Sequence, residues 1–519
     1  MRRLALLGFC LFLAACAVTP DKSVTPTSVS GKAFSQPVAL NAELIQRIHN
    51  TARHLGFDDS SYAFMAQAVP HPYEAQQVNK ILSYRADASM QPASTIKLLT
   101  TAVALERLGP EHRGFTEMRT LALTDHQQLR GDLWLIAGAD PEFGLSALWE
   151  MLVKLRSQSI RVIEGDLLVD RHRFKPSRFD QDLAPFDDAP EFPYNYIPDA
   201  LSAHGGLQDI LIRADRSATQ AKLVPDLPGI VVDNQLLLND APCHRWSSSG
   251  WKIPQQRLES DGRTVIVLSG TFPRQCTQQA KLQLVDRNRL LEAQFRWLWT
   301  QLGGDWHGRH GRLREVAEDE AARTSMTNNS ATTLLVRREA RPWGEWIRPL
   351  NKRSDNALTR LLFLEIGALA AGPNMKNVSS FDLADREIRA WLTKRSINPE
   401  GLVLDNGSGL SRTERVTARQ MVSMLIKLSQ EHRYHDLMMS LPVAGEDNTL
   451  KRRYTGSLAN GSARLKTGSL WNVSAIAGVV YDRKQRPWMV SVMVNHPKAS
   501  AAAPLITEIV DTIASYDLD

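Results

Sequence analysis

The chain of 519 residues has little cysteine, little net charge and no internal repeat. Its formal net charge of +6 is spread along the sequence, and this distribution offers no concentrated basic patch for nucleic acid. The 13 histidines are scattered and lack H-E-x-x-H spacing, so we expect no metal site and no cofactor. With 43% hydrophobic and 23% charged residues, the composition is that of a globular protein, and the length suggests about three domains.

The first 15 residues follow the pattern of a signal peptide, with two arginines, then an apolar run and then small residues. The apolar run is too short to span a membrane. The segment "LAAC" looks like a bacterial lipobox, in which the cysteine is the lipid attachment site. We therefore expect removal of residues 1–15, lipidation of Cys16, and a Ser/Thr/Pro-rich tether over residues 16–37. These features predict a periplasmic protein anchored to the outer membrane. A plain signal peptide followed by an incidental cysteine is the alternative.

The four cysteines divide between this leader and the body of the chain. Cys10 lies in the predicted signal peptide and Cys16 at its end, so Cys243 and Cys276 remain. Two remaining cysteines in an exported protein favour one disulfide, and two buried free thiols are the alternative.

A serine and a lysine, Ser94 and Lys97, stand three residues apart near the start of the helix predicted over 91–110. At this spacing they share a helix face, and the helix N-terminus favours negative charge that develops on the serine. A neutral lysine amine can accept the proton of the hydroxyl. The spacing alone is a weak signal, because S-x-x-K also occurs at 249–252, where a glycine and a proline oppose a helix.

Two further short motifs follow in the second half of the chain. Ser354-Asp355-Asn356 begins a predicted helix, and Lys466-Thr467-Gly468 lies in a predicted strand. Taken singly, Ser354 could be a helix N-cap and the lysine motif a plain strand edge. The order of the three motifs and their helix, helix and strand contexts favour a shared catalytic site.

With these motifs the sequence resembles the low-molecular-weight class C penicillin-binding proteins, the D-alanyl-D-alanine carboxypeptidase/endopeptidase family. The blocks "GDLWLIAGADPEF", "LDNGSGLSR" and "LPVAGEDNTLKRR" extend the resemblance over roughly residues 40–510. It implies an α+β penicillin-binding/transpeptidase fold, an antiparallel sheet flanked by helices, with β-rich domains inserted between the first and second motifs. We place the first part of the transpeptidase-like domain at 38–113, the insertion at 114–282 and the second part at 283–519.

The resemblance also implies the chemistry and the partners. Ser94 attacks a D-Ala-D-Ala or D-Ala-diamino-acid bond of peptidoglycan stem peptides, while Lys97, with a pKa lowered by burial and by the charge of Lys466, takes its proton. Ser354 relays the proton to the leaving amine, and Asn356 holds Lys97. Lys466 and Thr467 bind the terminal carboxylate, and Gly468 lets the substrate lie against the strand. The oxyanion sits between the backbone N–H groups of Ser94 and Ser469. β-Lactams enter the same cycle and stall as acyl-enzymes.

The sequence departs from the family pattern at two positions. Ser469 replaces the commoner threonine, which keeps the hydroxyl, and Glu414 stands where a small polar amide is expected. Asp140 is predicted to be a turn residue, with a substrate contact as the alternative. Two other functions stay open at this point: a β-lactamase or esterase on the same fold, and a non-catalytic scaffold that binds cell-wall peptides.

Overall fold

The structure is a computed structural model. It describes residues 42–70, 80–121, 124–125, 127–308, 312–316, 332–371, 378–447 and 450–517. The predicted signal peptide, the lipid attachment site Cys16 and the tether lie outside the described residues. Across the described ranges, no helix is both long and apolar enough to cross a membrane.

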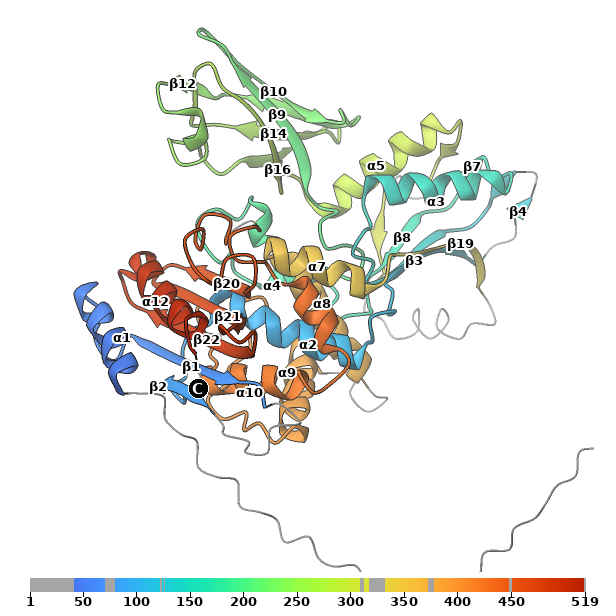
Figure 1. The fold of residues 1–519 in the computed structure, drawn as a ribbon. Coiled ribbons are helices and arrows are strands. Elements are labelled where there is room, and N and C mark those ends of the chain that lie inside the picture. The colour runs from blue at the N-terminus through green and yellow to red at the C-terminus, as the bar shows by residue number, and fades with distance from the viewer. Residues whose placement is uncertain are drawn as a thin grey trace, which may run out of the picture. The chain divides into compact units, whose positions relative to one another are not determined.

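A five-stranded antiparallel sheet joins the two ends of the described chain. Its strand order is β2-β1-β22-β21-β20, with strands β1 Tyr62–Ala68, β2 Ile81–Tyr84, β20 Arg464–Leu470, β21 Val473–Tyr481 and β22 Pro487–Asn495. β22 lies between β1 and β21, so strands from the start and the end of the sequence are neighbours (Figure 1).

Both faces of this sheet are buried, and alternate residues of one strand enter different hydrophobic cores. In β1, Ala63 and Met65 point into one core, while Phe64 and Ala66 point into the other. One face carries α1 Ala42–His54 and α12 Ala503–Ala514, which pack on each other (Figure 1).

The other face of the sheet carries the helices that hold the first two motifs, together with their neighbours. These are η1 Ala93–Ile96, α2 Lys97–Arg107, α7 Trp343–Arg353, α8 Asn356–Ala370, α9 Ser380–Lys394, α10 Ala418–Leu428 and α11 Tyr434–Ser440. η1 contacts β20 and β21, and α2 contacts α8, so the starts of α2 and α8 lie near β20.

The insertion contains sheets of its own. The largest is also five-stranded and has the order β18-β8-β6-β3-β19, with strands β3 Phe115–Thr120, β6 Leu133–Gly138, β8 Leu167–Asp170, β18 Arg314–Glu315 and β19 Thr333–Glu339. A second has the order β17-β7-β5-β4, with strands β4 Thr124–Asp125, β5 Gln128–Leu129, β7 Val162–Ile163 and β17 Asp305–Trp306.

Three further sheets follow between residues 208 and 282. They are β10-β9-β16, β11-β14-β13 and β12-β15, with strands β9 Gln208–Ala214, β10 Thr219–Val224, β11 Ile230–Asn234, β12 Leu237–Asn239, β13 Gln255–Leu258, β14 Thr264–Leu268, β15 Thr271–Pro273 and β16 Thr277–Leu282. The insertion also holds α3 Leu145–Ser157, α4 Phe179–Asp182 and α5 Arg287–Gln301.

The strand pairing crosses the domain boundary predicted at residues 282–283. β19 pairs antiparallel with β3, so the sheet that begins at Phe115 is completed only at Glu339. The helix α5, assigned from the sequence to the second part of the catalytic domain, packs on α3 of the insertion. The term insertion here covers residues 114–339, because β3 and β19 share one sheet across the boundary predicted at 282–283. The division into domains itself stays a prediction.

Cys243 and Cys276 form a disulfide with 5.3 Å between their Cα atoms. It links η3 Cys243–Arg245 to the residue before β16. The second S-x-x-K match, at 249–252, lies outside any helix: Trp251 pairs with Gly270 in an isolated β-bridge.

Candidate active site

Ser94 and Lys97 lie on consecutive turns at the start of one helical segment. Ser94 lies in η1, half-exposed, and Lys97 begins α2 with its side chain fully buried. The Lys97 Nζ atom is 3.1 Å from Ser94 Oγ, which is hydrogen-bond distance. The geometry therefore allows a proton to pass directly between the two side chains.

The Lys97 amine has two further hydrogen-bond partners. Nζ donates to Asn356 Oδ1 at 2.7 Å and to the backbone carbonyl of Ser408. Burial places the pKa of Lys97 well below its ordinary value, and the neighbouring charge of Lys466 acts in the same direction. These surroundings favour a neutral amine, which can accept a proton.

The second motif forms a tight turn between two helices. Ser354 caps the C-terminus of α7 in the left-handed conformation, with φ 57°. Asp355 is the N-cap of α8 and accepts the Leu358 N–H at 2.9 Å, so the N-cap is Asp355 and the alternative role for Ser354 is not realised. This turn directs Asn356 to Lys97 and the Ser354 hydroxyl to Lys466.

The third motif occupies β20, beside η1. Lys466 is buried, its Nζ donates to Ser354 Oγ at 2.8 Å, and burial lowers its pKa to about 7. A Cβ added at Gly468 would stand 2.6 Å from the Pro92 carbonyl oxygen and 3.0 Å from the Ser94 nitrogen. Glycine is therefore required for β20 to lie this close to the serine.

A cavity of about 470 Å³ opens above these groups. It is lined by Ser94, Phe186, Asp187, Tyr194, Ser354, Asn356, Gly409, Leu410, Arg412, Ser469, Leu470 and Trp471. Residues from all three motifs thus share one opening, while Lys97 and Lys466 lie buried beneath it.

Several residues at the rim are ones that the sequence reasoning missed. Trp471 is 79% exposed, directly after the third motif, and Arg412 lies in the block "GSGLSR". The insertion supplies another side of the rim, where the Tyr194 carbonyl accepts the Asn356 Nδ2–H at 3.1 Å. The position of Trp471 close after the third motif was the one signal for it in the sequence, but residue type does not show whether a side chain is exposed.

Asp140 lies away from this cavity. Its side chain is buried, where it forms an ion pair with Arg338 and a hydrogen bond with Thr116. It is not among the residues that line the catalytic cavity, so the structure gives no support for the alternative of a substrate contact.

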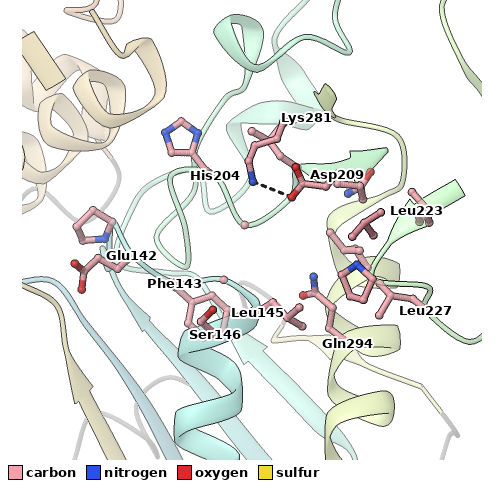
Figure 2. Close-up of a pocket in the computed structure, with 18 of the residues that line it drawn as sticks. Glu142, Phe143, Leu145, Ser146, His204, Asp209, Leu223, Leu227, Lys281 and Gln294 are labelled. Atoms are coloured by element: carbon pink, nitrogen blue, oxygen red, sulfur yellow. Dashed lines mark hydrogen bonds and ion pairs between the residues drawn. The ribbon is translucent and has the colours of Figure 1, made fainter. Parts of the chain in front are cut away.

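A second cavity, of about 560 Å³, lies in the insertion (Figure 2). His204 on its wall contacts Asp355 of the second motif, with 3.0 Å between Nε2 and Oδ2. Burial acts to raise the pKa of Asp355, but the His204 hydrogen bond and charge outweigh it and hold the pKa below its usual value. The insertion therefore contacts the second motif at a side chain as well as at the Tyr194 carbonyl.

The D-Ala-D-Ala carboxypeptidase 3 (S13) family matches residues 61–515, which include all three motifs. The chain belongs to this family. It is a serine-type D-Ala-D-Ala carboxypeptidase/endopeptidase of peptidoglycan, as the sequence predicts.

Two relatives illustrate how far this S13 chain has diverged. The D-alanyl-D-alanine carboxypeptidase of Actinomadura sp. (strain R39) is 28% identical over 75% of this chain and 70% of its own length. DacB of Haemophilus influenzae is 25% identical over 78% of this chain and 81% of its own. The crystal structure of penicillin binding protein 4 (dacB) from H. influenzae superposes with a TM-score of 0.71 at 19% identity, covering 90% of this chain and 99% of that one. The predicted α+β penicillin-binding fold is confirmed.

Proposed function

We propose that Ser94 is the nucleophile and Lys97 the general base of this carboxypeptidase. The observation that carries the proposal is the position of Lys97: fully buried, 3.1 Å from Ser94 Oγ and held by Asn356. As Ser94 Oγ bonds to the penultimate D-Ala carbonyl carbon, its proton passes to the Lys97 amine. The negative charge moves to the carbonyl oxygen.

Collapse of this intermediate breaks the C–N bond and needs a proton on the leaving amine. We assign that delivery to Ser354, whose hydroxyl lies 2.8 Å from Lys466 Nζ. The proton reaches the departing D-Ala nitrogen from the Ser354 hydroxyl, which is resupplied by the adjacent lysines. Water then attacks the acyl-enzyme, a proton returns to Ser94 Oγ, and the shortened peptide leaves.

We assign substrate positioning to β20. The ammonium of Lys466 and the hydroxyl of Thr467 bind the terminal carboxylate, and Gly468 allows the peptide to lie along the strand. The backbone N–H groups of Ser94 and Ser469 flank the oxyanion. Support comes from the packing of Gly468 against the Pro92–Ser94 backbone, and from Ser94 and Ser469 both lining one cavity.

We further propose that β-lactams acylate Ser94. The amide of a β-lactam ring enters the same attack, but its leaving nitrogen stays tethered to the acyl group. A solved structure of the H. influenzae penicillin binding protein 4 is a complex with a β-lactam. That relative supports the proposal by family membership.

We propose that the protein acts in the periplasm and is held at the outer membrane by lipid on Cys16. The leader sequence supports it. Membrane fractionation of wild type and Cys16→Ser tests the anchor: wild type is expected with the outer membrane, and wild type in the soluble periplasmic fraction contradicts the anchor.

Labelling with a fluorescent penicillin, together with chromatography of digested muropeptides, tests the catalytic assignment. Wild type should be acylated and should release D-Ala, and Ser94→Ala should do neither. Ser249→Ala, at the second S-x-x-K match, is the matched control and should behave as wild type. Equal labelling of Ser94→Ala and wild type contradicts the assignment. The identity of the muropeptide products distinguishes a carboxypeptidase, which trims monomers, from an endopeptidase, which cleaves crosslinks.

A further inference from the structure

Glu414 is a buried carboxylate that the catalytic scheme above does not use. Its side chain is 0% exposed, and Oε1 accepts three backbone N–H groups, from Asp405 at 3.3 Å, Asn406 at 3.1 Å and Gly407 at 2.7 Å. Three donors converging on one oxygen fix the conformation of the turn at 405–411.

The turn at 405–411 contacts both members of the first motif. The Ser408 carbonyl accepts from Lys97 Nζ. A Cβ added at Gly409 would stand 2.1 Å from the Ala93 carbonyl oxygen and 2.6 Å from the Ser94 nitrogen, so the turn lies directly on the backbone of Ser94. A change in the anchor of this turn would therefore move the base and the nucleophile together.

A hydroxyl on α2 also holds the turn at 405–411 through a hydrogen bond. Thr100 Oγ1 donates to the Gly407 carbonyl at 2.7 Å, while the Gly407 N–H donates to Glu414. The turn is thus held between Glu414 and the helix that begins with Lys97.

Glu414 also acts on Lys97 through charge. The charged groups that face Lys97 are Lys466 and Arg360, which disfavour the ammonium, and Glu414 and Asp355, which favour it. Arg360 and Asp405 in turn face Glu414. Oε2 of Glu414 is buried and has no hydrogen-bond partner in the part of the chain that the structure describes. Burial and the charge of Asp405 raise the pKa of Glu414, while the three backbone N–H groups act to lower it, so Glu414 acts on Lys97 through charge at pH values above its own pKa.

We propose that Glu414 is a positioning residue for the hydrolysis: it fixes the turn at 405–411 against Ser94 and Lys97, and its carboxylate stabilises the ammonium form of Lys97. The inference rests on the proposed role of Lys97 as the base. It predicts two separable effects, one of geometry and one of charge.

Two substitutions at this position separate the effects. Glu414→Gln keeps an oxygen acceptor for the three N–H groups and removes the charge. Glu414→Ala removes both. Glu365→Gln is the matched control, since Glu365 is also a fully buried carboxylate, but its side-chain partners are His112 and Arg173, away from the catalytic cavity.

The measurement is the rate of acylation by a fluorescent penicillin from pH 4 to pH 9, with thermal unfolding of each variant. In Glu414→Gln the acid limb should move to lower pH by about 1 pH unit, because Lys97 loses a stabilising negative charge, with a plateau rate within about tenfold of wild type. In Glu414→Ala the same shift should accompany a plateau about 100-fold lower, from misplaced reacting groups. Glu365→Gln should lower the melting temperature and leave the acid limb in place.

The outcomes distinguish this inference from the proposed function. If wild type is acylated and both Glu414 variants keep its rate and acid limb, the inference fails and the proposed function stands. If wild type is not acylated, both fail. If Glu414→Ala does not fold, Glu414→Gln alone tests the inference. An acid limb of Glu414→Gln that stays in place, or that moves no more than the acid limb of Glu365→Gln, overturns the inference.

Discussion

The catalytic domain and the insertion both bury cations, but they do so in opposite ways. Lys97 and Lys466 are buried without an ion pair to any carboxylate in the described ranges, and their pKa values fall. In the insertion, Arg287 is buried against Asp199 at 2.7 Å and Asp180 at 3.3 Å. Burial acts to lower its pKa, but Tyr196 and these two carboxylates together outweigh burial and raise it.

The difference shows what burial does in each region. The paired guanidinium of Arg287 keeps its charge and fixes one arrangement of the insertion, whereas the unpaired ammonium of Lys97 gives up its proton and becomes a base. The side-chain type follows the same division, since lysine loses a proton when it is buried and arginine does not. The predictions below test this contrast.

Lys97→Arg should have the largest effect. Arginine stays protonated at all relevant pH values, so it cannot accept the Ser94 proton, and the acylation rate should fall about 1,000-fold. Lys281→Arg, an exposed lysine paired with Asp209 in the insertion, is the control and should match wild type. A Lys97→Arg enzyme that keeps more than a tenth of the wild-type rate would contradict the assignment of the base.

Arg287→Met should lower the free energy of unfolding and leave the acylation rate unchanged. Removing one of the two guanidinium groups, those of Arg171 and Arg287, that neutralise the buried Asp199 leaves its charge under-compensated, and the free energy of unfolding should fall by about 3–5 kcal/mol. Arg274→Met, which breaks an exposed pair with Asp240, should cost about 1 kcal/mol or less. Urea unfolding measures both. If both variants lose the same unfolding free energy, the expected difference between buried and exposed ion pairs is wrong.

Asp199 should contribute to stability in a pH-dependent way. Burial acts to raise its pKa, but Arg171 and Arg287 hold the pKa at about 2, below the ordinary value of 3.8. A depressed pKa gives stability that is fully present above pH 3.8 and is lost as the pH falls toward 2, about 2 kcal/mol in total. The difference in unfolding free energy between wild type and Asp199→Asn should therefore narrow by about 1 kcal/mol from pH 6 to pH 3. A constant difference would show that Asp199 does not titrate with folding.

His204→Ala should have the smallest effect on catalysis. The histidine is partly exposed and touches Asp355 but none of the groups that exchange protons, so we expect acylation to slow by about threefold or less. His172→Ala, a histidine of the insertion paired with Asp170, is the control. Loss of more than about 100-fold in His204→Ala alone would place the insertion directly in the catalytic step.

The sequence predicted the fold and the three motifs because their chemistry is local. Ser94 and Lys97 share a helix turn, and so their relation is encoded within four residues. The second motif was harder to interpret, since Ser354 adopts a left-handed conformation and the neighbouring Asp355 takes the N-cap.

Other features depend on distant contacts and were not predictable. β19 pairs with β3 across more than 200 residues, so one sheet spans the domain boundary predicted at 282–283. Glu414 was noted as a departure from the family pattern, but its role needs the turn at 405–411, whose N–H groups converge on it only in the folded chain. Trp471 could not be assigned to the rim, because sequence does not show which tryptophans are exposed.

The central claim is that Lys97 is a neutral amine at the pH at which the enzyme works. The most direct test is the acylation rate of Ser94 measured from pH 4 to pH 11, with unfolding monitored at each pH. The account predicts an acid limb with its midpoint far below 10.5, the ordinary value for lysine, and full acylation rate near neutral pH. A rate that keeps rising until the pH passes 10 would contradict it.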